Sequence, residues 1–96
     1  MSKLPKDAGP QTLAVHAGEA PDEITGASSP SIVMSTTFTT KDAEAFSIKD
    51  FDEGDMPYIY TRWGNPTTNQ LQDKLRVLEG AESCLAFASG MAATSA

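Results

Sequence analysis

The sequence contains a single cysteine, a single histidine and no long hydrophobic run. Cys84 cannot form a disulfide within the chain, and it stands in an apolar run rather than at a metal-ligand spacing, so we expect a buried thiol and no metal site. The only histidine, His16, has no paired cysteine or carboxylate motif, which favours a surface or packing role over catalysis. No segment approaches the length that spans a bilayer, and residues 1–10 lack the apolar part of a signal peptide. The sequence therefore predicts a cytoplasmic protein without a membrane segment.

Basic residues are also scarce. Seven Lys and Arg stand against thirteen Asp and Glu, which gives a net charge of −6, and the basic residues form no cluster. A nucleic-acid partner is therefore not expected, because such proteins carry a basic patch. The hydrophobic share of 40% is close to that of globular proteins, and 96 residues suffice for one small domain at most.

The clearest structural signals stand in the C-terminal part of the chain. Asn65 and Pro66 are residues preferred at the N-cap and first position of a helix, and Gly80 suits its C-terminal end, so we predict a helix over about 66–79. Three leucines at helical spacing predict a buried stripe along that helix: Leu71, Leu75 and Leu78.

An apolar run follows over 84–88, with the length of a strand buried on both faces. Ser89-Gly90 interrupts it, and good helix formers then predict a second helix from about 90. This order is typical of an α/β architecture. Because one strand makes no parallel sheet, we expect the chain to be an incomplete part of a larger α/β domain.

The signals in residues 1–57 are weaker and predict an N-terminal arm, mostly extended and loop with short helices, ahead of an α/β domain that starts over 58–96. The expected elements of the arm are a short helix over 11–17, a loop over 18–30, an extended segment over 31–40, a short helix over 41–46 and an acidic loop over 51–57.

The turn at Ser89, Gly90 and Met91 is a candidate anion site, since it opens a predicted helix. Free N–H groups and the positive end of the helix dipole would face one point there, and glycine lets a phosphate approach the backbone. A purely structural turn remains the alternative. A nucleophilic Ser89 is disfavoured, because the GxSxG elbow needs glycines where Phe87 and Met91 stand.

Tyr60 and Arg62 form the second candidate anion site. Two positions apart, they would project to one side of an extended chain. A planar guanidinium and a phenolic hydroxyl together suit a phosphate. The alternative is an aromatic ring and an arginine packed against each other on a surface.

The segment YTRWGNPTTNQLQDKLRVLEGAESCLAFASGMAAT resembles the N-terminal signature of the Cys/Met-metabolism PLP-dependent enzymes, a family that includes cystathionine γ-synthase, cystathionine lyases, methionine γ-lyase and homoserine-ester sulfhydrylases. Residues 12–18 (TLAVHAG) and 35–38 (STTF) are also similar to the family. The resemblance implies the N-terminal part of a fold-type I (aspartate aminotransferase-like) PLP-dependent transferase large domain, with pyridoxal 5′-phosphate as cofactor.

The resemblance also implies roles for both candidate sites. Tyr60 and Arg62 would reach the cofactor phosphate of a neighbouring subunit, while Gly90 and Met91 would bind the phosphate in their own subunit. The implied assembly is a homo-oligomer, a tetramer built from dimers that share active sites.

The implied reaction is γ-elimination or γ-replacement on a small sulfur-containing or homoserine-derived amino acid. It requires a Schiff-base lysine, which in the family comes far downstream of the glycine turn, so we expect no catalytic residue in this chain and assign that lysine to the rest of the same polypeptide. The alternative is a short non-catalytic binding or assembly module that retains the arm and the anion-binding turn. The five lysines present stand in polar or surface-helix contexts: Lys3, Lys6, Lys41, Lys49 and Lys74.

Overall fold

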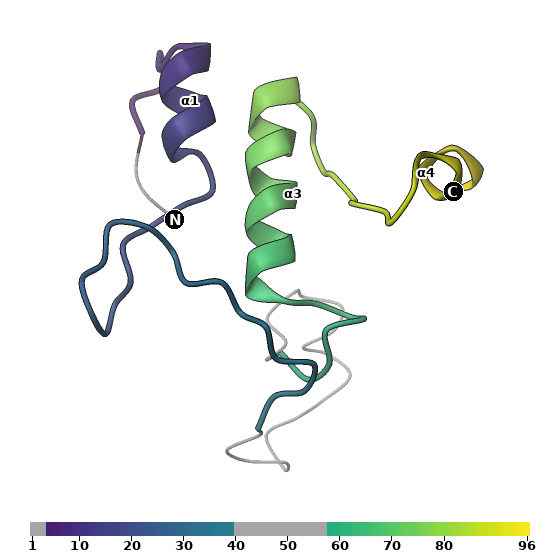
Figure 1. The fold of residues 1–96 in the computed structure, drawn as a ribbon. Helices are drawn as coiled ribbons and strands as arrows, with labels where there is room; N and C mark the ends of the chain where they lie inside the picture. The colour runs from purple at the N-terminus through teal and green to yellow at the C-terminus, as the bar shows by residue number, and fades with distance from the viewer. Residues whose placement is uncertain (1–3, 40–57) are drawn as a thin grey trace. The chain divides into compact units, whose positions relative to one another are not determined.

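The structure is a computed structural model that describes residues 4–39 and 58–96 of the chain. The described part contains three helices, α1 (Pro10–His16), α3 (Pro66–Glu79) and α4 (Gly90–Ser95) (Figure 1). By its contacts the chain divides into two compact units: one comprises Met1–Ile32 and Pro66–Ala96, and the other Val33–Asn65. The helices predicted over 11–17 and from about 90 correspond to α1 and α4. The helix expected over 41–46 and the loop over 51–57 lie outside the described residues.

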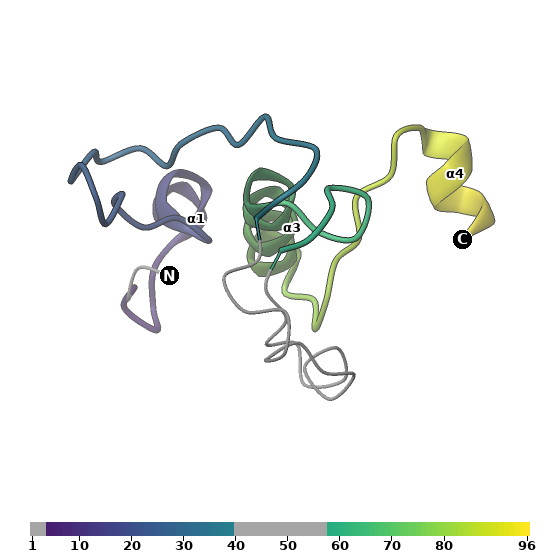
Figure 2. The ribbon, with the colours of Figure 1, turned by 90° about the horizontal axis from the view of Figure 1, so that it is seen from below.

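The first unit is built on α1 and α3, which lie side by side in both ribbon views (Figures 1 and 2). Gly18 follows α1 with a φ of +72°, a backbone conformation that residues other than glycine rarely adopt. A Cβ at this position would lie 3.1 Å from the backbone nitrogen of Lys74 and 3.2 Å from the backbone oxygen of Gln70. Gly18 therefore lets the chain turn and pass close to α3. Ala17, directly before it, is the buried apolar residue of the described chain, at 2% exposure.

Lys74 connects the two helices through its ammonium group. Its Nζ lies 2.5 Å from Oε2 of Glu19 and donates a hydrogen bond to the carbonyl oxygen of Val15 at 3.3 Å. Both side chains of the ion pair are about one-quarter exposed, at 25% and 28%, so water screens the attraction only in part. The loop after α1 is thus tied to α3 by charge as well as by close packing.

The loop over 18–30 has no helix or strand, as the sequence predicted, and it is ordered by a turn at Asp22. The hydroxyl and the backbone N–H of Thr25 both donate to Oδ2 of Asp22 at 2.7 Å. These hydrogen bonds favour the charged carboxylate, so they lower the pKa of Asp22 below its ordinary value.

Helix α3 spans Pro66–Glu79, the range that the capping signals predict. Its end is a Schellman motif, in which Ala81 N–H donates to Arg76 O and Gly80 N–H donates to Val77 O. Gly80 adopts a φ of +66°, the left-handed conformation that this motif places after a helix. The local sequence therefore determines where this helix ends.

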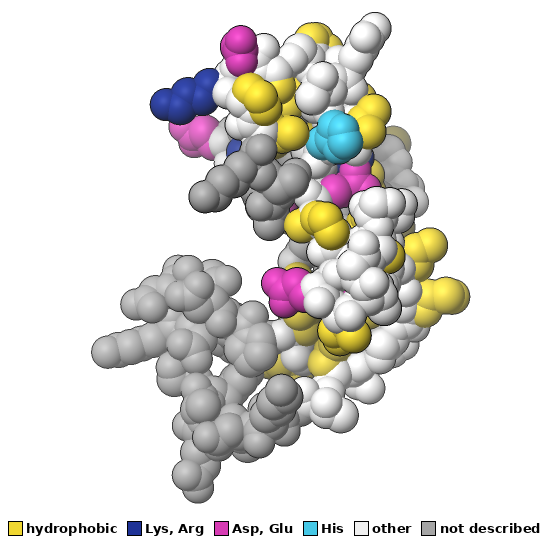
Figure 3. Space-filling model, turned by 90° about the vertical axis from the view of Figure 1, so that its left-hand side faces the viewer, with side chains coloured by type: hydrophobic (Ala, Val, Ile, Leu, Met, Phe, Trp, Pro, Cys, Tyr) yellow, Lys and Arg dark blue, Asp and Glu magenta, His cyan; other side chains and the backbone are white. Residues whose placement is uncertain are grey.

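The leucine stripe of α3 is not buried, and the prediction that it would be is wrong for this chain. Leu71, Leu75 and Leu78 are 50%, 40% and 40% exposed. The physical reason is the lack of covering surface, because α1 is the only helix that packs on α3 within the described residues. Figure 3 shows hydrophobic side chains at the surface of the molecule.

Residues 84–88 do not form a paired strand in the described part of the chain. Their backbone is held to α3 at one point, where Ala86 N–H donates to Oε1 of Gln72 at 3.0 Å. A strand forms its backbone hydrogen bonds with a neighbouring strand. The strand over 84–88 therefore stays a prediction that requires neighbouring strands. Cys84 is half-buried rather than buried.

No helix among residues 4–39 and 58–96 combines the length and apolar character that a membrane span requires.

Candidate functional site

Tyr60 and Arg62 lie in the second unit, where two distant segments pair. An antiparallel bridge joins Thr37 to Tyr60. Phe38 N–H donates to Ile59 O at 3.1 Å, and Thr61 N–H donates to Thr36 O at 2.8 Å. The backbone of Tyr60 is therefore fixed against the segment that the sequence predicted to be extended.

A turn, rather than an extended strand, brings the two side chains of this candidate site together. The N–H groups of Trp63 and Gly64 both donate to the carbonyl oxygen of Tyr60, at 2.9 and 3.2 Å, so the chain bends directly after Tyr60. The extended spacing on which the same-side prediction rested therefore ends at Tyr60. The two side chains are in contact nonetheless, as the alternative of an aromatic ring packed against an arginine also predicts, and their phosphate role stays a prediction.

The guanidinium of Arg62 stacks on the ring of Tyr60. Its Cζ lies 4.8 Å from the ring centroid, within the range of a cation–π contact. Trp63 meets the same ring edge-on, with centroids 6.3 Å apart, and its side chain is 67% exposed. The stacking covers one face of the Arg62 guanidinium, whereas its N–H donors point outward in the plane of the group and Arg62 as a whole is exposed.

The side-chain amide of Asn65 links this turn to the facing segment by hydrogen bonds, a role that the sequence does not predict. The side chain of Asn65 is buried, at 4% exposure. Its Nδ2 lies 3.1 Å from Val33 O, 3.5 Å from Ser35 O and 3.2 Å from Oγ1 of Thr61. The hydroxyl of Thr61 in turn donates to Ser35 O at 2.5 Å. The sequence predicts only an N-cap role for Asn65, at the start of the following helix.

Gly90 and Met91 lie in the first unit, at the start of α4. Ser89 is the N-cap in an extended conformation, and its Oγ accepts from Ala92 N–H at 3.1 Å while its carbonyl accepts from Ala93 N–H at 3.2 Å. The N–H groups of Gly90 and Met91 are not used by this cap. A Cβ at Gly90 would meet nothing within 4 Å among the residues of this chain.

The donors at both places suit a phosphate. One pair offers a guanidinium and a phenolic hydroxyl, and the other offers backbone N–H groups at a helix N-terminus. The structure therefore brings Tyr60 and Arg62 together in one unit, and Gly90 and Met91 together in the other. Among the described residues, no group of three or more His, Cys, Asp or Glu side chains is placed to hold a metal ion.

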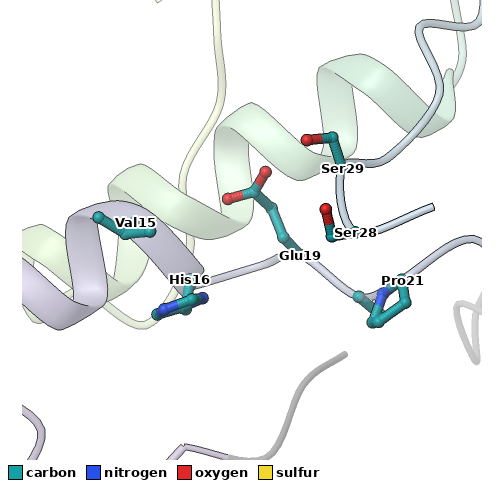
Figure 4. A pocket seen from close by; sticks show the side chains of 7 residues that line it. Val15, His16, Glu19, Pro21, Ser28 and Ser29 are labelled. Atoms are coloured by element: carbon teal, nitrogen blue, oxygen red, sulfur yellow. The ribbon is translucent and has the colours of Figure 1, made fainter.

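The first unit also has an open hollow of about 450 Å³ beside the end of α1. Figure 4 shows the six labelled side chains that line it: Val15, His16, Glu19, Pro21, Ser28 and Ser29. Its carboxylate, from Glu19, is already paired with Lys74. None of the four phosphate-binding candidates lines the hollow.

Comparison with known proteins identifies the class. The family described as Cys/Met metabolism PLP-dependent enzyme matches residues 11–96. The chain belongs to this family, as its sequence resemblance predicted, and pyridoxal phosphate is the cofactor on which the family depends.

Individual relatives support the assignment. The chain is 35% identical over 94 residues to O-acetyl-L-homoserine sulfhydrylase of Leptospira meyeri, covering 94% of this chain and 20% of that protein. It is 44% identical over 84 residues to cystathionine gamma-lyase of Macaca fascicularis, covering 86% of this chain and 18% of that protein. The chain thus spans about a fifth of the length of these relatives.

A solved structure shares the fold. The crystal structure of metB from Corynebacterium glutamicum superimposes with a TM-score of 0.74 at 39% identity, covering 93% of this chain and 21% of that one. The described chain therefore has the fold of the corresponding part of a larger enzyme of this family.

Proposed function

We propose that this chain is the N-terminal part of a PLP-dependent enzyme of sulfur amino-acid metabolism that catalyses γ-elimination or γ-replacement. The observation that carries the proposal is the family match over residues 11–96, which includes both phosphate-binding candidates. The relatives include a sulfhydrylase and a lyase, so both reaction types lie within the proposal. The finer fold proposal is an N-terminal arm followed by the start of a fold-type I large domain.

Within this function, the chain anchors the cofactor phosphate. Arg62 supplies a permanent positive charge with a planar fork of donors, and the Tyr60 hydroxyl donates beside it. Gly90 and Met91 supply backbone N–H donors at the positive end of α4, and the missing side chain of Gly90 allows close approach. When bound, PLP supplies the electron sink that stabilises negative charge on an amino-acid substrate.

The proposed assembly is a homo-oligomer, a tetramer built from dimers that share active sites. Tyr60 and Arg62 serve the cofactor of a neighbouring subunit, and Gly90 and Met91 serve their own subunit. The support for this division is the family membership of residues 11–96, because the family resemblance implies these roles for the two pairs.

The full-length protein is expected to bind PLP at one equivalent per subunit. The bound cofactor should give a visible absorbance band that shifts on adding O-acetylhomoserine, cystathionine or methionine, and at least one of these substrates should be turned over. Pyridoxal, which lacks the phosphate, serves as the control and should bind more weakly. A protein that binds neither compound, or a natural protein whose intact mass shows a short chain without a cofactor lysine, would contradict the proposal.

A further inference from the structure

We propose that Asn65 and Thr61 are positioning residues for the phosphate-binding pair. They hold the turn that carries Tyr60 and Arg62 against the backbone of residues 33–36. The inference rests on the proposed role of Tyr60 and Arg62 in binding the cofactor phosphate, and it adds residues that do not touch the phosphate themselves.

The burial of Asn65 is the first observation behind this inference. It is the buried polar residue among residues 4–39 and 58–96, at 4% exposure. An amide out of water is costly unless its donors are used, and here Nδ2 faces three acceptors: the carbonyl oxygens of Val33 and Ser35 and the hydroxyl oxygen of Thr61. Val33 and Ser35 lie 32 and 30 positions before Asn65 in the sequence, so these contacts join distant segments.

The position of Thr61 is the second observation. It stands between Tyr60 and Arg62, and both its backbone and its side chain are tied to the facing segment. Its N–H donates to Thr36 O at 2.8 Å, and its hydroxyl donates to Ser35 O while accepting from Asn65. The hydrogen bonds therefore join Asn65 to Thr61, the residue between the two proposed phosphate ligands, and join both to the facing segment.

Positioning matters here because Arg62 is exposed and its side chain has many rotamers. A ligand that fixes a mobile arginine loses affinity to the ordering of that side chain, and a preorganised turn reduces this loss. The stacking of Arg62 on Tyr60 holds the guanidinium only if the backbone keeps the two residues in register. Loosening Asn65 or Thr61 should therefore weaken phosphate binding without removing a phosphate ligand.

The competing explanation is that Asn65 only caps α3. Capping uses the side-chain oxygen as an acceptor, whereas the contacts described above use the amide as a donor. Asn65→Ser keeps a good N-cap and adds no charge, but its short side chain cannot reach Val33 O and Ser35 O together. Thr61→Val keeps the shape and loses the hydroxyl, while Thr61→Ser keeps the hydroxyl. Because Thr61 is exposed, these two variants should leave folding intact.

The test measures two dissociation constants for the full-length protein in phosphate-free buffer, and takes the ratio of the Kd of pyridoxal to the Kd of PLP. Sedimentation checks the oligomeric state of each variant. We expect Asn65→Ser and Thr61→Val to lower this ratio by about 5- to 30-fold through weaker PLP binding alone. Thr61→Ser should restore the wild-type ratio. An unchanged ratio in Thr61→Val, or an equal loss of PLP and pyridoxal binding in both variants, would overturn the inference.

Arg62→Ala, measured in the same way, separates this inference from the proposed function. If Arg62→Ala lowers the ratio and Thr61→Val does not, the positioning role is wrong and the phosphate-binding role stands. If Arg62→Ala leaves the ratio unchanged, the proposed role of Arg62 is itself wrong, and the positioning role falls with it.

Discussion

Replacing Arg62 with alanine weakens the binding of PLP to the full-length protein by about 1.5–3 kcal/mol, which is the contribution expected of a hydrogen bond to a charged group. The guanidinium is the permanent positive charge of the Tyr60–Arg62 pair, and it is held in place by stacking on the tyrosine ring 4.8 Å away. Spectroscopic titration of the apoprotein with PLP measures the effect. The affinity for pyridoxal should change little, since that compound has no phosphate.

Two matched variants refine this first prediction. Arg62→Lys keeps the charge and loses the planar fork, so its affinity for PLP should lie between those of the wild type and Arg62→Ala. Tyr60→Phe keeps the ring on which Arg62 stacks and removes only the hydroxyl, so it should weaken PLP binding by about 1.5 kcal/mol, the lower end of the range for a hydrogen bond to a charged group. An Arg62→Ala protein that binds PLP as tightly as the wild type would rule out Arg62 as a phosphate ligand.

Gly90→Val is the second change with a large expected effect. A Cβ at this position meets nothing within 4 Å in the chain itself, and Gly90 does not have a positive φ, so the backbone of this chain should accept a side chain without strain. Valine also has a higher helix propensity than glycine. Stability should therefore be kept, whereas the side chain would stand where a phosphate approaches the N–H groups of α4.

The expected loss in PLP affinity for Gly90→Val is about 1.5–3 kcal/mol, if one charge-assisted backbone hydrogen bond is blocked. Calorimetric titration with PLP, together with thermal unfolding of the apoprotein, checks both halves of the prediction. Gly9→Ser is a suitable control, because a Cβ there also meets nothing within 4 Å and serine is a preferred residue at the N-cap of α1, which Gly9 occupies. Equal PLP affinity in Gly90→Val and wild type would show that no phosphate approaches this turn.

Local signals allowed part of the fold to be predicted from the sequence. The limits of α3 follow from residues at its own ends, Pro66 at the first position and Gly80 in the Schellman motif. Burial was not predictable in the same way. The periodicity of Leu71, Leu75 and Leu78 marks a face that suits burial, but whether that face is covered depends on surfaces elsewhere.

In the candidate site too, features that depend on neighbouring residues could be predicted, whereas contacts between distant segments could not. Tyr60 and Arg62 could be proposed as a phosphate site from the sequence because their chemistry and spacing are local, although a turn rather than an extended strand brings them together. The donor role of Asn65 could not be predicted, since its acceptors at Val33 and Ser35 lie far away in the sequence and only the folded chain places them beside the amide. The sequence offers one indication of this role, an asparagine three positions after Arg62, and the same asparagine also fits the N-cap of α3.

The proposal assigns the Tyr60–Arg62 pair and the Gly90–Met91 pair of one chain to phosphates in different subunits. A mixture of Arg62→Ala and Gly90→Val proteins tests this assignment most directly. In a mixed dimer, the Arg62→Ala subunit keeps its own Gly90 and receives an intact Arg62 from its partner, so one site of the two is whole and the other carries both substitutions. Unfolding and refolding the proteins together should therefore restore tight PLP binding and activity that neither variant has alone. If both pairs served the same subunit, every site would carry one defect, and a mixture with no more tight binding than the separate variants would contradict the account.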